Sequence, residues 1–478
     1  MNIDKIKVLA WSALLTSSIV LCGCNDYLNE IPKGQKTPTT WEDYNAFIRT
    51  TEKHYLEMDQ MFCLVGDLFY TPNQLNSNQL ANAHYFWNEE VDRTQINSTD
   101  KNAYYNAYEA LFYANLIIDG APTAADATEE KRQMLTAQGR VLRAWVYYYL
   151  VNYYADQYTE STKHLLAVPL VTSSSVTSPS PQGTLEEVYR LILSDLEAAV
   201  PHLPQEGESL FHPTVVTAYG LLARTHLSMN NYDQALVYAN KALEINDQLF
   251  NWVAFYEADR ARYESSSNYA VGVNGNPERN NPENYFFHFG SMNMYRGNNN
   301  VSYALPPERA TRFEAGDTRL LTHWKRRVSA SGIEYQAGIY GLEPNKGGMR
   351  SPEMYYIKAE CLARQGGAAN LEAAMELVNR VRKTRILPEY YTDWTASTTQ
   401  EAVEKIINDK ANEYIQSSVV FCDYRRLNKT PEYARTLTKT VNGTIYKLNP
   451  NSHLWIMPFP NEAMSNPGNG TLKQNVTR

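Results

Sequence analysis

The sequence predicts a mainly α-helical protein in which a helical-repeat scaffold carries long irregular excursions. Between residues 99 and 154, apolar residues recur mostly at three- and four-residue intervals, the period of a helix with one buried face. Between about 247 and 349 this periodicity fades, and Asn, Gly, Pro and Ser accumulate among scattered aromatic residues. We therefore expect the scaffold mainly in 99–246 and 350–430.

One pair of predicted helices has the spacing of a tetratricopeptide (TPR) unit. Its positions are Tyr219, Leu222, Ala223 and His226 on the first helix, and Ala235 and Ala239 on the second. Small residues at such positions let two helices approach closely. A looser copy is expected between about Met354 and Arg382, with an insertion between its helices. The helices of 99–154 could form another.

Other segments have local signals of their own. Thr184 and Glu187 form a capping-box pattern that begins a helix running through Val200, and Pro201 ends it. Residues of about 62–98 form a second, shorter excursion. Because irregular segments on a helical scaffold often carry function, both excursions are expected to face a ligand.

Composition excludes one class of partner and favours another. The formal net charge is -8 and the sequence pI is about 5.7, which argues against binding to nucleic acid, since that requires concentrated Lys and Arg. The chain contains 35 Tyr, 14 Phe and 8 Trp, whose flat faces suit either a large helical core or a sugar-binding surface.

The N-terminus has the pattern of an exported, lipid-anchored protein. Lys5 and Lys7 precede a mostly apolar run too short for a comfortable membrane span, which predicts a signal peptide over 1–23. The run ends in a lipobox-like sequence, so Cys24 is the expected lipidation site. Residues 24–40 are expected to form a lipidated tether, and 41–478 a single domain.

The cysteines that follow Cys24 are Cys63, Cys361 and Cys422, and Cys22 would leave with the signal peptide. Their odd number and the absence of a C-x-x-C pair indicate buried thiols, and neither a disulfide framework nor a zinc site. No other metal or cofactor site is indicated.

Five patches spread along the chain have a family pattern. They are Cys24–Leu28 with Pro32; Asn106–Asn115 with Arg143–Trp145, Tyr148 and Leu150; Pro306–Phe313 with Asp317 and Arg319; Arg350 with Glu353, Tyr356, Ala359 and Glu360; and a C-terminal set of Glu413, Asp423, Arg425, Arg426, Pro458–Pro460, Glu462, Asn466, Pro467, Leu472, Gln474 and Asn475. In this order they resemble the SusD/RagB family, nutrient-binding lipoproteins of Bacteroidetes outer membranes. Ser417, Ser418 and Val420 depart from the family pattern, as does Val476 after Asn475.

The resemblance implies a SusD-like fold of four TPR units with a less regular ligand-facing portion. It also implies a lid role over a SusC-like TonB-dependent transporter at the cell exterior. It transfers no ligand-binding residue, because ligand sites vary widely within the family.

Sequence motifs give little support to catalysis. There is no G-x-S-x-G and no H-E-x-x-H, although paired carboxylates for a glycoside hydrolase are abundant. Glu353 and Glu360 are expected to have helix-surface or repeat-packing roles, and Arg425 and Arg426 to hold the fold as ion partners. We therefore expect no catalytic residue.

Three functions remain open: a glycan-capturing lipoprotein, a peptide- or protein-binding TPR module, and a lipid-anchored hydrolase. A glycan offers C–H faces to aromatic rings and hydroxyls to polar side chains, and both excursions contain that mixture. The candidate ligand residues, chosen by type and loop context, are Asp67, Asn73, Trp87, Tyr285, Tyr295 and Trp324.

Overall fold

The computed structural model describes residues 37–50, 54–96, 102–265, 278–290, 304–328, 332, 334–338, 345–465 and 472–476. The expected signal peptide, Cys24 and most of the expected tether lie outside these residues. The scaffold helices are α6 (Asn102–Gly120), α7 (Glu129–Tyr154), α8 (Leu185–Ala199), α9 (Val215–Ser228), α10 (Tyr232–Ile245), α16 (Ser351–Gln365), α17 (Ala368–Arg382), α18 (Thr399–Glu413) and α19 (Ser418–Leu427).

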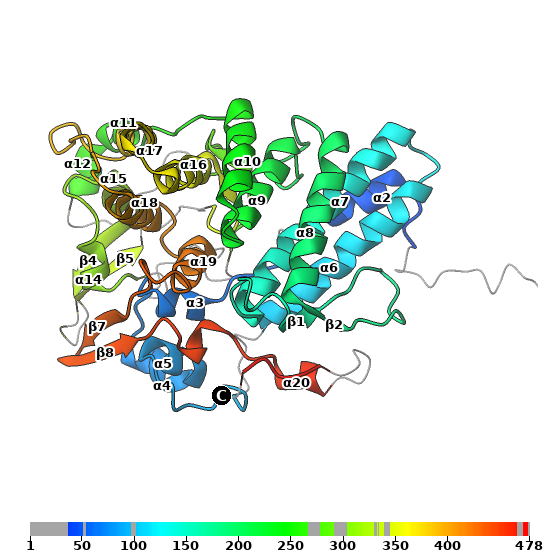
Figure 1. Ribbon diagram of the computed structural model, residues 1–478, viewed down its shortest axis with the longest axis horizontal. Helices are drawn as coiled ribbons and strands as arrows, with labels where there is room; N and C mark the ends of the chain where they lie inside the picture. Colours follow the sequence, from blue (N-terminus) through cyan, green and yellow to red (C-terminus); the bar gives the residue numbers. More distant parts are fainter. Residues whose placement is uncertain are drawn as a thin grey trace, which may run out of the picture. The chain divides into compact units, whose positions relative to one another are not determined.

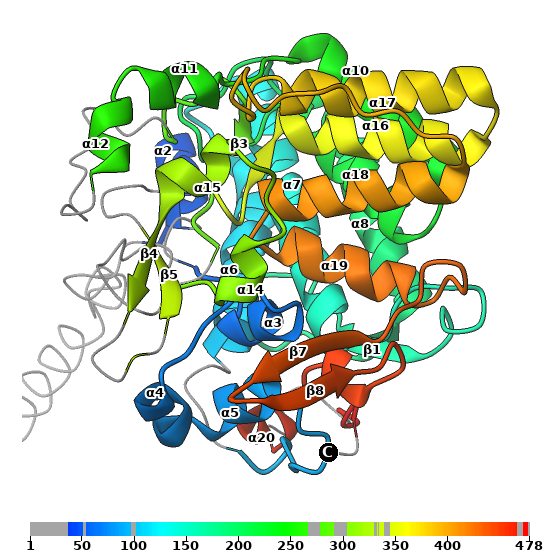
Figure 2. The same cartoon turned by 90° about the vertical axis from the view of Figure 1, so that its left-hand side faces the viewer.

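These helices pack mostly as neighbours in chain order, which confirms the predicted TPR-like, mainly α fold. Helix α7 packs between α6 and α8, and α9 packs against α10. Helix α10 then packs against α16, which joins the two halves of the scaffold across the long excursion between them (Figures 1 and 2).

The predicted TPR spacing corresponds to α9 and α10. Leu222, Ala223, Ala235 and Ala239 are fully buried, so small side chains lie where the helices meet. The predicted insertion in the copy at 354–382 is wrong. Helices α16 and α17 are joined by Gly366 and Gly367 alone, whose φ angles of 72° and 83° allow a turn that other residues rarely adopt.

Helix α8 begins as its capping box predicts. The Thr184 hydroxyl accepts a hydrogen bond from the backbone of Glu187, and the Glu187 carboxylate accepts one from the backbone of Thr184. The regular helix ends at Ala199, and a 3-10 turn, η5 (Val200–His202), contains Pro201.

The excursions and the other segments between scaffold helices contain short helices and two-stranded antiparallel sheets. The short helices are α2 (Trp41–Ile48), α3 (Asp59–Leu64), α4 (Pro72–Ser77), α5 (Gln79–Tyr85), η4 (Ala121–Thr123), α11 (Trp252–Glu257), α12 (Arg260–Glu264), α14 (Pro307–Ala310), α15 (Thr318–His323), η7 (His453–Trp455) and α20 (Asn461–Met464). The sheets pair β1 (Leu166–Pro169) with β2 (Gln182–Thr184), β3 (Asn284–Phe286) with β6 (Met349–Arg350), β4 (Trp324–Val328) with β5 (Glu334–Gly338), and β7 (Leu437–Val441) with β8 (Thr444–Leu448). Residues from Thr40 onward form one compact unit.

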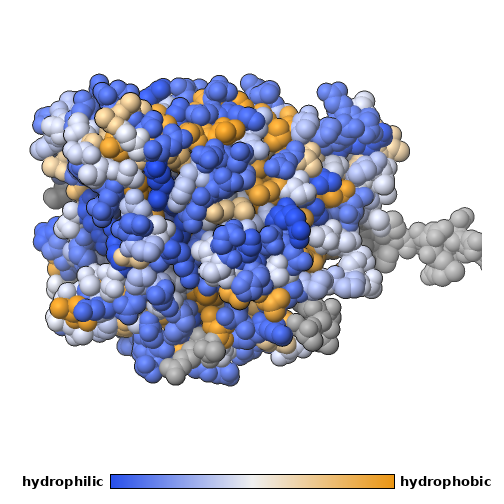
Figure 3. Space-filling view, in the orientation of Figure 1, coloured by the Kyte–Doolittle hydropathy of each residue, from blue (hydrophilic) through white to orange (hydrophobic). Residues whose placement is uncertain are grey.

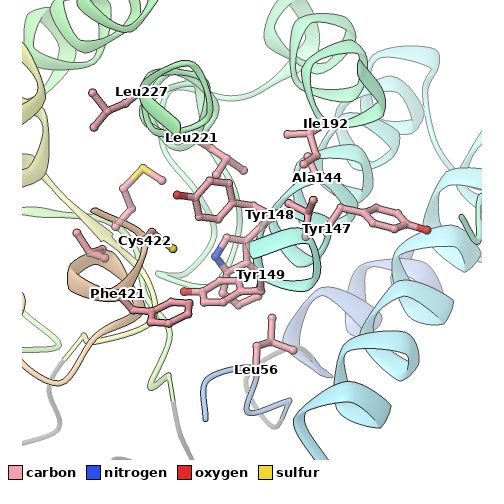
Figure 4. Packing of buried hydrophobic residues seen from close by; sticks show 14 of the residues in the cluster. Leu56, Ala144, Tyr147, Tyr148, Tyr149, Ile192, Leu221, Leu227, Phe421 and Cys422 are labelled. Carbon is pink, nitrogen blue, oxygen red and sulfur yellow. The ribbon is translucent and has the colours of Figure 1, made fainter. Parts of the chain in front are cut away.

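Much of the aromatic excess fills the core. On α7, Tyr147, Tyr148 and Tyr149 are buried and point in different directions because successive helical residues are about 100° apart (Figure 4). Each hydroxyl keeps a partner: Tyr148 hydrogen-bonds Ser228 at 2.9 Å, and Tyr149 donates to the carbonyl of Gly347 at 2.5 Å. One helix thereby contacts several others while these tyrosine hydroxyls keep hydrogen-bond partners.

Cys63, Cys361 and Cys422 are free and buried, as predicted. Burial raises the pKa of Cys361 and Cys422 to about 12, so both remain neutral thiols. Within the described part of the chain, no helix is long and apolar enough to cross a membrane.

A buried network of arginines and carboxylates joins the scaffold to the long excursion. Glu413, at the end of α18, accepts hydrogen bonds from Arg385 at 3.0 Å, Arg350 at 2.9 Å and Arg319 at 3.3 Å. Arg385 and Arg350 also bind Glu283, which precedes β3, at 2.7 and 2.8 Å. All five side chains are buried, so each charge is stabilised by its oppositely charged neighbours in place of water.

The pairing controls the charge of Glu413. Burial alone would raise its pKa, but the guanidinium groups of Arg385, Arg350 and Arg319 hold it well below the ordinary value. Arg319 extends the network by binding Asp317 and Asp409, each at 2.7 Å.

Removing the charge of Glu413 is expected to destabilise the protein. Glu413→Gln keeps the shape but leaves buried guanidinium groups short of a counter-charge, so the free energy of unfolding should fall by about 3–5 kcal/mol in urea titrations. The matched control is Glu334→Gln, which breaks an exposed pair with Arg326 and should cost less than about 1 kcal/mol. Equal losses in the two variants would contradict a central role for Glu413.

A second buried carboxyl should make stability depend on pH. Burial raises the pKa of Glu57 to about 7, although Ser418 and Tyr149 donate hydrogen bonds to it. As pH rises from about 5 to 7, the unfolded state releases this proton while the folded state holds it, so stability is lost. Glu57→Gln should therefore gain up to about 3 kcal/mol relative to wild type between pH 5 and 8. Urea unfolding at each pH measures this difference, and a difference that stays constant would refute the assignment.

Candidate ligand-binding face

The two excursions meet next to the scaffold. The backbone N–H of Phe69 donates to the carbonyl of Ala304 at 2.8 Å, and Leu305 pairs with Gln336 of β5. The rings of Phe69 and Tyr335 stack with centroids 5.3 Å apart and planes within 4°. Segments separated by more than 200 residues thus form one surface, near α3, α14 and β5 in Figure 2.

We call the exposed part of this region the excursion face: Tyr70, Asn73, Arg327 and Tyr335. Tyr335 is partly exposed, and its ring rests on Phe69, which is 7% exposed. Asn73 is exposed on α4, and Arg327 lies directly opposite Tyr335 in the antiparallel pair of β4 and β5, on the same side of the hairpin. An aromatic ring supported from below, with a guanidinium on the same side of the hairpin, suits a hydroxyl-rich ligand.

Asp67 lies below this face. Its carboxylate binds Arg309 of α14 at 2.5 Å and accepts from the backbone of Gln416 at 3.3 Å, and its side chain is 1% exposed. Arg309 also donates to Asn412 and to the carbonyl of Ala411. This geometry favours a structural role that ties α14 to α18, and ligand contact by Asp67 stays a prediction.

Trp87 is also buried, with 6% of its surface exposed. Its indole N–H donates to the carbonyl of Cys63 at 3.3 Å, and the ammonium of Lys439 lies 4.3 Å from the ring centroid. The same ammonium lies 4.4 Å from the ring of Tyr85, and burial lowers the pKa of Lys439 to about 8. A protein cation therefore occupies the site over Trp87 that a sugar would need.

Tyr285 and Trp324 pack inside the protein as well. Tyr285, in β3, is 5% exposed and donates to the carbonyl of Asn246. Trp324 borders a polar cavity of about 30 Å³ together with Glu278, His323 and Lys346. That volume holds a water molecule and excludes a sugar ring.

Of the six predicted residues, Asn73 is exposed and Tyr295 lies outside the described residues. The structure therefore does not bring the predicted set together on one surface. Tyr335 was missed, although a turn glycine, Gly332, next to a short strand pattern could have indicated a hairpin that presents it.

The chain was compared with known protein families. Residues 238–477 match the profile described as "SusD family", and residues 37–227 match one described as "Starch-binding associating with outer membrane".

The chain belongs to the SusD family.

Similar proteins agree with this membership. A SusD-like protein P25 from Formosa agariphila is 24% identical over 244 residues, a region that spans 47% of this chain and 43% of that relative. A SusD superfamily protein from Bacteroides thetaiotaomicron has 15% identity and a TM-score of 0.69, covering 91% of this chain and 100% of its own. A SusD-like carbohydrate binding protein from Bacteroides vulgatus has 15% identity and a TM-score of 0.65, covering 92% and 100%. The two structures establish that the fold is shared.

Several carboxyl groups of this SusD-family chain are buried inside the fold. Glu57, whose raised pKa would suit a general acid, is buried beneath Gly290. Glu353 and Glu360 are buried and paired with Arg224 and Arg426, which supports their expected packing roles. Among the described residues, no three His, Cys, Asp or Glu side chains are placed to hold a metal ion.

Proposed function

We propose that this chain is a cell-surface lipoprotein that binds an oligosaccharide or polysaccharide and delivers it to a SusC-like TonB-dependent transporter, without catalysing a reaction. The observation that carries the proposal is the excursion face, where the ring of Tyr335 rests on Phe69 and Arg327 lies on the same side of the hairpin. The family supports it, since one matching profile is described as starch-binding and associated with the outer membrane.

The physics of the face agrees with a sugar ligand. A sugar ring stacks its C–H groups on an aromatic face, and burial of that contact stabilises the complex. Asn73 and Arg327 supply donors, and the amide oxygen of Asn73 supplies an acceptor, for hydroxyl groups. Figure 3 shows the side of the molecule seen in Figure 1, which is largely hydrophilic, with hydrophobic residues in scattered areas. Such a surface suits a polar ligand better than a broad apolar partner.

Anchoring at Cys24 completes the proposal. Acyl chains contribute roughly 0.8 kcal/mol for each buried methylene, so two or more chains hold a protein at a membrane without a spanning helix. An anchored binder keeps captured sugar close to the transporter, because tethering raises the local concentration of the ligand.

The first test is calorimetric titration of the purified chain with plant, host-mucin and microbial oligosaccharides. We expect saturable binding, and Tyr335→Ala should weaken it about tenfold, which is about 1.4 kcal/mol. Phe112→Ala is the matched control, because Phe112 is an exposed aromatic residue on α6, outside the excursion face. Chromatography of each mixture should show intact sugar. Released fragments would support a hydrolase, and binding of peptides alone would support a peptide-binding module.

The second test concerns the anchor and the transporter. In the native host, wild-type chain should be found in the outer-membrane fraction, and detergent extracts should contain it together with a TonB-dependent transporter. Cys24→Ser removes the acylated thiol, so the chain should move to soluble fractions while its binding of sugar stays unchanged. Cys22→Ser, at the neighbouring cysteine, serves as the control and should leave the chain membrane-bound. Membrane retention of Cys24→Ser would rule out this anchor.

A further inference from the structure

A wide groove lies on the scaffold between α17 and the connection that leads to α18. Its volume is about 930 Å³, within the range of roughly 300–1,000 Å³ typical of ligand pockets. In Figure 2 the connection, residues 383–398, runs back along α17. The groove involves neither the excursion face nor any residue predicted from the sequence as a ligand contact.

Hydrogen bonds fix the connection at a distance from the helix. The side chain of Asn379 accepts from the backbone N–H of Trp394 and donates to its carbonyl, both at 2.8 Å. The hydroxyl of Tyr391 donates to Asp393 at 2.6 Å, and Lys405 donates to the carbonyl of Thr395 at 2.7 Å. The groove is thus pre-formed, so a ligand would not need to order the loop.

An arginine supports the aromatic part of the groove. The guanidinium of Arg382 lies 3.8 Å from the ring centroid of Trp394 and 5.3 Å from that of Tyr391. Arg382 is fully buried and also binds Glu314 at 2.8 Å and the carbonyl of Thr392 at 2.9 Å. Trp394 is partly exposed and borders the groove, so its ring is held in a fixed position where a ligand can reach it.

The rim carries acceptors that the fold does not use. Glu372 and Glu376 are exposed on α17 and border the groove. In the part of the chain that the structure describes, no group donates to either carboxylate. Asp393 adds a third carboxylate. The exposed cations Arg380 and Lys383 also border the groove, and Arg380 is paired with Asp247 at 2.8 Å. The buried side chains of Leu371 and Met375 form an apolar portion between these polar groups.

We propose that this groove is a second saccharide-binding site, for a neutral glycan chain. This inference rests on the proposed function, because it assumes that the ligand is again a saccharide. It concerns a separate surface. Sugar hydroxyls donate hydrogen bonds to carboxylates such as Glu372 and Glu376, and the ring of Trp394 offers a stacking platform.

The rim also determines which glycans fit. Because the three carboxylates outnumber the two cations at the rim, Arg380 and Lys383, sugars that carry uronate or sulfate groups are disfavoured here. Two sites on one chain allow a long polysaccharide to be held at two points, which raises its apparent affinity without new contacts at either site.

The test compares the two surfaces by calorimetry, using the whole chain with neutral cello-, xylo-, manno- and malto-oligosaccharides and with oligogalacturonate. The groove variants are Ser397→Trp, which fills the space from an exposed position on the rim, and the double variant Glu372→Gln with Glu376→Gln. Each should raise the Kd of one of two sites at least tenfold and leave the site affected by Tyr335→Ala unchanged. Oligogalacturonate should bind the groove at least tenfold more weakly than the neutral chain.

Glu244→Gln is the matched control, because Glu244 is exposed on α10 outside the groove. If Tyr335→Ala abolishes all sugar binding and the groove variants bind as wild type, this inference is wrong and the proposed function stands. If no sugar binds to any form, both fail. If the groove variants instead reduce the binding of a lysine-rich peptide, the groove binds peptides and the inference is likewise overturned. Sugar binding lost with Ser397→Trp and kept with Tyr335→Ala supports the groove alone.

Discussion

The charge of Glu413 is the constraint on which the irregular half of this protein depends. Moving an isolated carboxylate or guanidinium out of water costs several kcal/mol, so neither can be buried here alone. Glu413 lies at the end of a scaffold helix, whereas Arg319 belongs to the long excursion and Arg385 to the connection after α17. Because each charge requires the others, the long excursion is held at one position on the scaffold.

A buried arginine paired with a carboxylate also lies beneath each of the two candidate binding surfaces. Arg309 holds Asp67 and the end of α18 below the excursion face, and Arg382 holds Glu314 and the ring of Trp394 below the groove. Guanidinium groups suit this role because their planar set of donors can bind carboxylates, carbonyls and aromatic faces together. Each surface thus has a rigid base made by the fold, with partly or fully exposed side chains above it.

The repeating part of the fold could be predicted from the sequence, whereas the candidate site could not. Helical period and small residues at TPR spacing report local packing, which a short stretch of chain determines. Exposure depends on the whole fold: Trp87 is covered by Lys439, and Asp67 is paired with Arg309, in each case by residues more than 200 positions away. Residue type and loop context identified aromatic and acidic side chains without showing which are buried. The turn glycine Gly332 could indicate a hairpin at Tyr335, but not that Phe69, from another excursion, supports the ring.

The long sequence separations within the arginine network also bear on when the protein folds. Glu283, Arg350 and Glu413 lie in three segments that come together only in the finished structure. During synthesis the N-terminal helices of a chain are available before α18 is. Non-local contacts of this kind form late, because the intervening chain must first be ordered. The scaffold helices near the N-terminus can therefore assemble first, while the long excursion reaches its final position only after Glu413 has been synthesised.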